Sequence, residues 1–271
     1  MEDGDEALLE GGEPLGSYDA GAYKGVPEIK VDMSNATPEQ KEQIERAALT
    51  YSFGCKEEKD PEACFLLGQF KEIYEREYVG ASALFRETCE GEPPYGPSCF
   101  YYAKYLLSGA AAAFASNERR MQWAAQMSCD DPTHPVAPAC MAAAHLQMFG
   151  LPSGNKAFVD ATRALRSLRR ACEEMNCADA CHWLSTWYIA SDAFSSDKKD
   201  PRQVEVQKTI ERLVPADPAK AFHYALKACD MGGVEGCHNV GLMYQKGLGV
   251  AADPALAKRY TDLARKMMRR S

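Results

Sequence analysis

The sequence predicts an all-α solenoid built from helix–turn–helix repeats, and three observations support this prediction. Residues 221–249 split into two helical patterns around a glycine-rich turn. Ten of the eleven cysteines fall into five pairs with similar spacing inside each pair. Small and bulky residues recur at fixed offsets from these pairs. Because two short amphipathic helices cannot bury both apolar faces alone, such units stack and bury one continuous core.

The last unit carries the clearest pattern. In its first helix, apolar residues recur every three or four positions, as on one face of an α-helix, at Ala221, Tyr224, Ala225, Ala228 and Cys229. Gly232 and Gly233 then favour a left-handed helix end. The second helix repeats the spacing at Cys237, Val240, Gly241 and Tyr244, and it ends at Gly247 and Gly249.

The cysteine pairs set the register of the array. The second cysteines of successive pairs are separated by 35, 41, 41 and 56 residues. Four residues after each comes a small residue, which close helix crossing requires: Gly68, Ala103, Ala144, Ser185 and Gly241. Two further on comes a bulky residue: Phe70, Tyr105, Leu146, Trp187 and Met243. Eight residues before each first cysteine lie Ala47, Ala81, Met121, Ala164 and Ala221.

The repeats occupy residues 38–271, after an acidic, Gly- and Pro-containing tail over residues 1–37. Thr37 is the expected cap of the first helix, with Gln40 completing a capping box. The expected units run over residues 38–78, 79–114 and 117–150, then from about 156 to about 190. An insertion at 191–218, with a possible short helix at 202–213, precedes the fifth unit. A helix after Pro254 has no following partner, so we expect it to cap the array.

The last unit resembles the Sel1-like repeat, through the glycines, tyrosines and cysteines just described and the continuation Val250 to Asp253. The version with one cysteine pair per repeat is similar to two families, the Helicobacter cysteine-rich proteins and the mitochondrial cytochrome c oxidase assembly factor 7 proteins. The resemblance covers roughly residues 38–271 and is degenerate in the first four units. It implies a helical-repeat scaffold that binds other proteins.

Each cysteine pair flanks one short turn, which brings the two β-carbons close enough for a disulfide if the helices cross there. The expected bonds are Cys55–Cys64, Cys89–Cys99, Cys129–Cys140, Cys172–Cys181 and Cys229–Cys237, with Cys177 as a free thiol. In the fourth unit, Cys177 could replace Cys172 or Cys181 in the disulfide. The cysteine intervals are too long for zinc knuckles, so we expect no metal, no cofactor and no catalytic residue.

Charge and cysteine usage constrain the compartment. Of the formal net charge of −8, residues 1–36 carry −7, from nine acids and two lysines, so the repeats offer no electrostatic footprint for nucleic acid. No apolar run is long enough for a transmembrane segment. The start lacks the features of a secretory signal or an Arg-rich presequence. Oxidised pairs then favour the mitochondrial intermembrane space, whereas reduced thiols favour the cytosol.

Several side chains have two interpretations each. His182 and His238 each follow the second cysteine of a unit. Each is either a histidine at a helix start that forms a local hydrogen bond, or a ligand of a haem or a metal. Trp183 and Trp187 suit packing between repeats. Arg163, Arg166 and Arg170 form a stripe that is either solvated or directed at an anionic partner.

The function that the resemblance implies is a non-enzymatic scaffold of the intermembrane space. It would act in cytochrome c oxidase assembly, or as an accessory subunit of a respiratory complex. Its partners would be subunits or assembly intermediates, bound on the concave face, with the tail and the insertion at the rim. The alternatives are an adaptor in the cytosol or a secretory compartment, and a thiol–disulfide oxidoreductase acting near Cys177.

Overall fold

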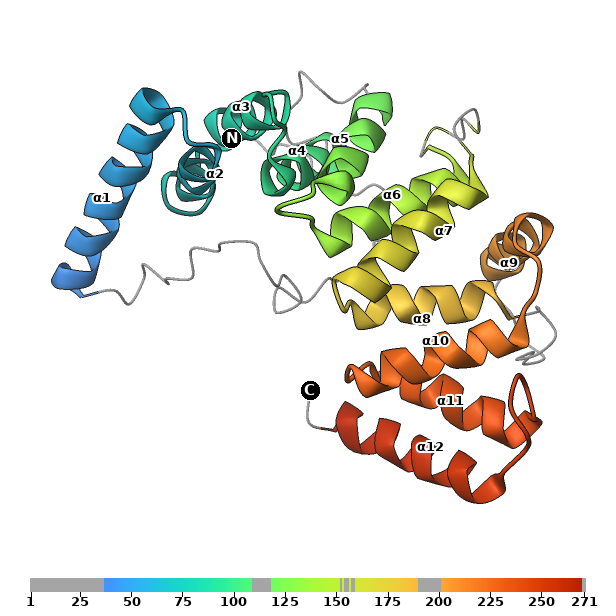
Figure 1. The fold of residues 1–271 in the computed structure, drawn as a ribbon. Helices are drawn as coiled ribbons and strands as arrows, with labels where there is room; N and C mark the ends of the chain where they lie inside the picture. Colours follow the sequence, from blue (N-terminus) through green and yellow to red (C-terminus); the bar gives the residue numbers. More distant parts are fainter. Residues whose placement is uncertain are drawn as a thin grey trace, which may run out of the picture.

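The computed structural model is a curved array of helices, which confirms the predicted all-α solenoid (Figure 1). It describes residues 37–108, 118–151, 153, 156, 159–189 and 201–269, with the backbone alone at 201–203 and 205–207. The tail at 1–36 and the polar start of the insertion at 191–200 lie outside these residues. Within the described part of the chain, no helix is long and apolar enough to cross a membrane.

Each predicted unit corresponds to one pair of consecutive helices, and the final helix α12 follows the fifth pair. The pairs are α1 (Pro38–Phe53) with α2 (Pro61–Phe70), α3 (Tyr78–Cys89) with α4 (Gly96–Ser108), α5 (Glu118–Asp130) with α6 (Ala137–Phe149), α7 (Ala161–Arg169) with α8 (Ala178–Trp187), and α10 (Pro218–Asp230) with α11 (Val234–Lys246). The insertion contributes α9 (Pro201–Leu213), and α12 spans Pro254–Met268.

Side-chain caps determine where many of these helices begin. The capping box predicted at Thr37 and Gln40 is present. Asp160, Asp217 and Asp253 each accept a hydrogen bond from a backbone N–H in the first turn of the next helix, which satisfies donors that the helix itself leaves unpaired. The fourth unit therefore begins at Ala161 rather than near residue 156, because Asp160 supplies the cap.

Three helices end in a wider π-helical turn that the sequence did not reveal. These turns are η3 (Gly54–Glu58), η4 (Lys71–Glu75) and η5 (Arg170–Glu174). A residue in the left-handed conformation follows each turn, directly at Lys59 and Arg76 and after Met175 at Asn176, with φ of 57°, 55° and 53°. Two of the turns carry the first cysteine of a pair, so the local widening helps to set where that sulfur lies.

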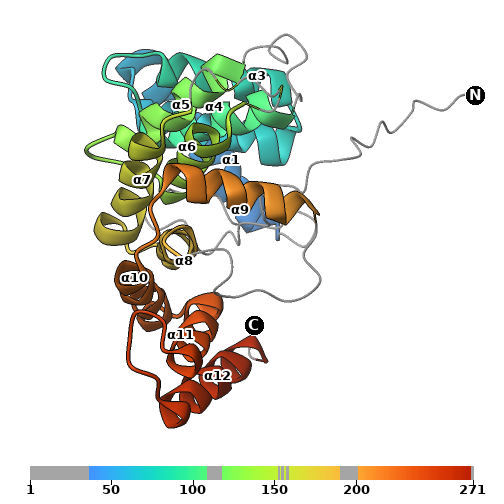
Figure 2. The same cartoon turned by 90° about the vertical axis from the view of Figure 1, so that its right-hand side faces the viewer.

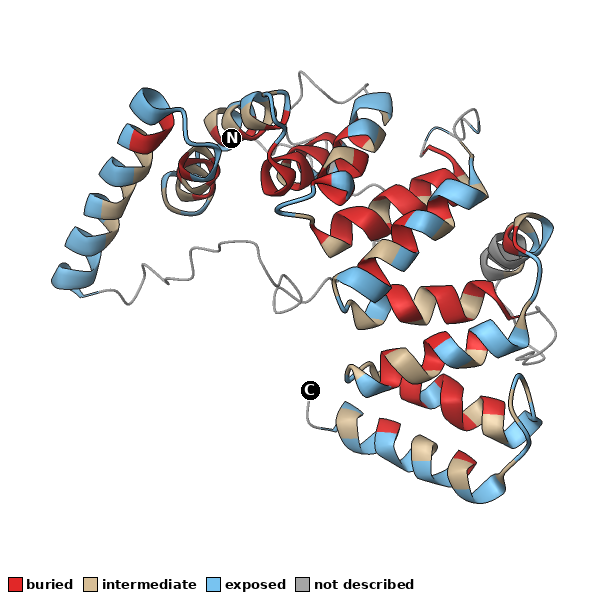
Figure 3. Cartoon of the chain, in the orientation of Figure 1, coloured by how far each residue is buried: buried red, intermediate tan, exposed pale blue. Residues whose placement is uncertain are grey.

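Neighbouring units share a continuous core, seen as buried stripes along the facing sides of the helices (Figure 3). The small residues at the recurring position lie at the contact between units. A Cβ atom on Gly68 would come within 2.6 Å of the Phe85 ring in the next unit, and one on Gly241 within 2.6 Å of the Thr261 hydroxyl on α12. Close crossing of helices is therefore the reason for these two glycines.

Aromatic stacking repeats at two successive contacts between units. Tyr188 stacks on Tyr224 with ring centroids 6.0 Å apart, and Tyr244 stacks on Tyr260 at 5.8 Å. In each pair the first tyrosine comes seven residues after the second cysteine of its unit, and the second tyrosine lies on the next helix that packs there. The helix α12 thus uses the same contact as a complete unit, as expected of a cap.

The insertion helix α9 packs on α6, on the outer side of the curve, away from the opening between α1 and α12 (Figures 1 and 2). Ile210 and Val214 are buried in the core shared by the last three units. The described part of the insertion therefore stabilises the array from outside and does not line the concave rim.

Candidate interaction surface and cysteine framework

The structure joins the two cysteines of every unit. The bonds are Cys55–Cys64, Cys89–Cys99, Cys129–Cys140, Cys172–Cys181 and Cys229–Cys237, with Cα atoms 4.4 to 4.8 Å apart. The first cysteine ends one helix, and the second lies in the first turn of the next. The backbone N–H of each second cysteine bonds the carbonyl four residues earlier, as in Cys181 to Cys177 at 3.2 Å, so the helix start itself positions the sulfur.

Cys177 carries the remaining thiol and is the N-cap residue of α8. Its Sγ atom lies 3.8 Å from Sδ of Met141 in the preceding unit. Burial raises the pKa of the Cys177 thiol, and the Asp179 carboxylate adds to this in part. The thiolate, which is the reactive form, is therefore disfavoured at neutral pH.

The arginine stripe separates into residues with different roles. Arg170 is tied into the structure, because its guanidinium donates to the carbonyl oxygen of Asp131 at 3.0 Å and lies 3.3 Å from the Glu174 carboxylate. Arg163 and Arg166 are exposed, and within the described residues neither side chain has a hydrogen-bond or ion-pair partner. These two guanidinium groups remain available to a ligand.

A groove of about 510 Å³ lies between α5 and α7 and contains the whole stripe. The three acids that line it are already engaged: Asp160 caps α7, Asp130 accepts from the Gln126 side chain at 2.7 Å, and Glu174 pairs with Arg170 at 3.3 Å. With these acids occupied, the groove offers two free positive charges, which favours a partner with carboxylates.

His182 and the two tryptophans of the fourth unit serve packing. Nδ1 of His182 lies 3.3 Å from the side-chain nitrogen of Asn239 on α11, so its contact crosses to the next unit instead of being local. Burial lowers the pKa of His182. Trp183 and Trp187 stack with ring centroids 6.4 Å apart, whereas His238 is exposed.

Sequence reasoning missed one buried carboxylate, Asp131, which connects two units. It accepts hydrogen bonds from the backbone N–H groups of Gly96 at 2.7 Å, and of Thr133 and His134 at 2.8 Å. The Asp-Pro-Thr-His run is a local turn signal that reveals part of this arrangement. The bond to Gly96 joins residues 35 apart, which no local pattern predicts.

Comparison with protein families identifies the Sel1 repeat at residues 211–233 and 234–267. Residues 211–267 of the chain thus carry two Sel1 repeats. The fold of this chain matches that of a Sel1 repeat protein from Oxalobacter formigenes, with a TM-score of 0.62 and 16% identity, over 84% of this chain and 82% of the other.

Two relatives extend the similarity along the array. The chain is 27% identical to the cytochrome c oxidase assembly factor 7 homolog of Drosophila melanogaster over 238 residues, covering 84% of this chain and 88% of the relative. It is 25% identical to cytochrome c oxidase assembly factor 7 of Xenopus tropicalis over 239 residues, covering 88% and 93%. The chain is thus similar to the assembly factor 7 proteins over most of both lengths, which confirms the resemblance inferred from the cysteine pattern.

Proposed function

We propose that this protein is a scaffold for the assembly of cytochrome c oxidase in mitochondria, and that it works in the intermembrane space. The observation that carries the proposal is the similarity to cytochrome c oxidase assembly factor 7 proteins over 84 to 88% of this chain. The five stapled units also suit an oxidising compartment, because disulfides of this kind do not persist in the cytosol.

The proposed activity is binding, without catalysis by the chain itself. The ten paired cysteines hold helix ends together, and Cys177 is half-buried with a raised pKa. A thiol that exchanges rapidly is instead accessible and has a low pKa. Both observations support a structural role for the sulfurs.

The groove between α5 and α7 is the proposed contact surface for assembly partners. Arg163 and Arg166 present two unpaired charges one helical turn apart, a spacing that suits successive acidic side chains of a docked segment. Charge complementarity of this kind mainly sets encounter rate and specificity.

A complementation experiment tests the function and the surface together. Cells from which the gene is deleted should lose assembled cytochrome c oxidase on native gels, and the wild-type chain should restore it. The variant Arg163→Glu, Arg166→Glu should fold and accumulate normally yet restore the enzyme poorly. The matched control Lys258→Glu, Arg259→Glu reverses two exposed charges on α12 and should restore it fully.

Location is tested separately on isolated mitochondria. The protein should resist added protease while the outer membrane is intact and become accessible when that membrane is ruptured by swelling. Unchanged oxidase levels after deletion would contradict the assembly role. Recovery of the protein in the cytosolic fraction would contradict the compartment.

A further inference from the structure

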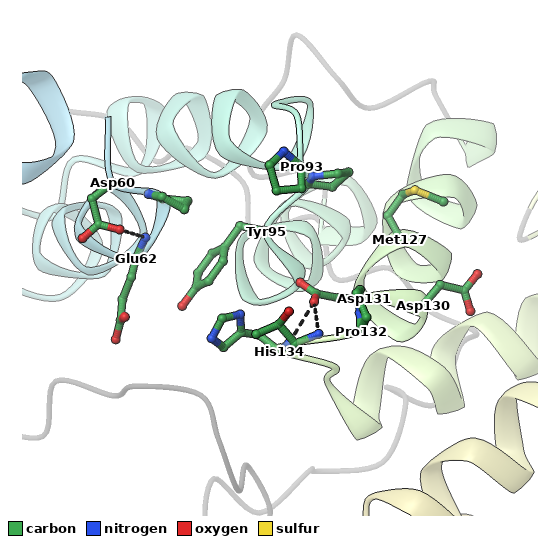
Figure 4. Close-up of a pocket in the computed structure, with 12 residues that line it drawn as sticks. Asp60, Glu62, Pro93, Tyr95, Met127, Asp130, Asp131, Pro132 and His134 are labelled. Carbon is green, nitrogen blue, oxygen red and sulfur yellow. Dashed lines mark hydrogen bonds between the residues drawn. The ribbon is translucent and has the colours of Figure 1, made fainter. Parts of the chain in front are cut away.

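A second hollow lies where the turns of the first three units meet, and we call it the turn pocket (Figure 4). It encloses about 360 Å³. Each of the three turns contributes to its wall, with Pro61 and Glu62 from the first, Pro93 and Tyr95 from the second, and Pro132 and His134 from the third.

Two of these turns are clamped to each other, so this part of the pocket is preformed. The buried Asp131 carboxylate accepts from the Gly96 N–H in the second unit as well as from its own turn. At Gly96 the approach is so close that an added Cβ atom would lie 2.5 Å from the His134 carbonyl oxygen. A pocket of fixed shape loses less conformational entropy when it binds a ligand.

The side chain of Tyr95 is the feature that points to a ligand. Only 5% of it is exposed, and its ring packs against Phe65 at 5.9 Å and His134 at 5.2 Å between centroids. It extends into the space between Glu62 and His134 (Figure 4). Among the described residues its hydroxyl has no hydrogen-bond partner. The ring is buried, whereas the hydroxyl borders the open volume of the pocket, in which a ligand can pair with it.

The charge around Tyr95 is negative. Burial raises the pKa of the Tyr95 hydroxyl, and the nearby carboxylates of Glu62, Asp60 and Asp131 raise it further. No lysine or arginine lines the pocket. The Asp131 carboxylate is already saturated by backbone N–H groups, whereas the exposed Glu62 carboxylate has no partner within the described residues. An anionic ligand is therefore excluded, and a cationic one is favoured.

The remaining wall is apolar. Pro61, Pro93, Pro94 and Pro132 offer rigid surfaces with no backbone N–H to satisfy. A ligand that matches both parts of the pocket has an alkyl stem and a cationic head. Lysine and arginine side chains have this construction, because they bury their methylene groups while the charge stays near polar partners.

We propose that the turn pocket receives a lysine or arginine side chain of a partner polypeptide. The stem lies against the prolines, and the head group donates to the Glu62 carboxylate and to the Tyr95 hydroxyl oxygen. This pocket adjoins the groove between α5 and α7, because Asp130 borders both, but only the groove contains Arg163 and Arg166 and therefore has the opposite charge preference. The inference does not depend on the proposed role in oxidase assembly.

Calorimetric titration of the full chain with acetylated, amidated tetralysine tests the proposal, with tetraglutamate as the opposite-charge probe. Tetralysine should bind, and tetraglutamate should bind at least about tenfold more weakly because of charge repulsion. Amide resonances of Gly96, Thr133 and His134 should shift on binding, since these groups line the clamp. Tyr95→Phe, which keeps the ring, and Glu62→Gln should each raise the Kd roughly 3- to 10-fold.

The control is Glu235→Gln, because Glu235 is also an exposed first-turn glutamate of a second helix, far along the array. It should leave the Kd unchanged. If Glu235→Gln weakened tetralysine binding as much as the pocket variants do, or if Tyr95→Phe and Glu62→Gln left the Kd unchanged, the binding would be nonspecific charge attraction. Either result would overturn the proposal. If the double variant Lys24→Gln, Lys30→Gln bound tetralysine much more tightly than the wild-type chain, the lysines of this chain would be the occupants of the pocket. This result would overturn the assignment to a partner.

Discussion

Replacing Gly68 with alanine tests whether the small residue at the recurring position is required by contact between units. The added Cβ atom would lie 2.6 Å from Cε1 and 3.0 Å from Cζ of Phe85. Phe85 is fully buried, and its ring is confined by Phe65, Tyr101 and Tyr105 at centroid distances of 5.7, 5.0 and 5.9 Å. The ring therefore has little room to yield.

Two opposing effects set the magnitude. Overpacking of a filled core costs about 1–3 kcal/mol, and the crowded ring favours the upper end. Alanine gains about 1 kcal/mol over glycine in a helix interior. The net loss for Gly68→Ala should be about 2 kcal/mol. This corresponds to a fall in Tm of roughly 4–8 °C, given about 2–4 °C per kcal/mol for chains near this size.

Gly80→Ala is the matched control, because Gly80 is also a helix glycine but faces only the exposed carboxylate end of Glu77, which can shift while it stays paired with Lys71. It should raise stability by up to about 1 kcal/mol. Denaturant unfolding followed by circular dichroism compares the two variants. Adding Phe85→Leu to Gly68→Ala should relieve the clash, so the double variant should be more stable than the two separate losses predict. If Gly68→Ala stabilised the protein as Gly80→Ala does, the packing argument would be refuted.

Three further predictions concern sulfur and histidine. Alkylation of the denatured, unreduced protein should label Cys177 alone by peptide mapping; label on all cysteines would rule out the framework. Replacing Cys129 and Cys140 with alanine should cost about 2–3 kcal/mol of unfolding free energy, since the bridge closes a short loop with a sequence separation of 11; an unchanged denaturant midpoint would contradict this. Because burial lowers the pKa of His182, the unfolded chain binds more protons below the ordinary histidine value, near 6.5, and stability should fall between about pH 7 and 5. His182→Gln should reduce that slope, and an unchanged slope would assign the pH dependence to other groups.

Much of the architecture follows from local pattern. The spacing of cysteines and small residues placed the five helix pairs, because each pair obeys one set of offsets. The cap at Thr37 and the proline starts of α2, α10 and α12 are local signals with a defined backbone consequence. These features depend only on residues within one or two turns of each other.

The features that the sequence did not predict depend on contacts between units. The role of Arg170 depends on an Asp131 carbonyl 39 residues earlier in the chain. In the sequence, nothing distinguishes Tyr95 from any other tyrosine in a turn. Only the neighbouring turns surround its hydroxyl with a pocket of acidic side chains and prolines. The π-helical turns depend on how each helix end meets its neighbour, so propensity alone did not reveal them.

The sulfur bridges bear on how the chain folds during synthesis or transport. Each bridge joins residues separated by only 8 to 11 positions, and none connects different units. A chain that enters a compartment from one end can therefore complete each bridge before the next unit arrives, without waiting for distant segments. Low sequence separation of this kind favours rapid, stepwise folding. No disulfide crosses from one unit to the next, so only packing and hydrogen bonds, such as that from Gly96 to Asp131, hold neighbouring units in place.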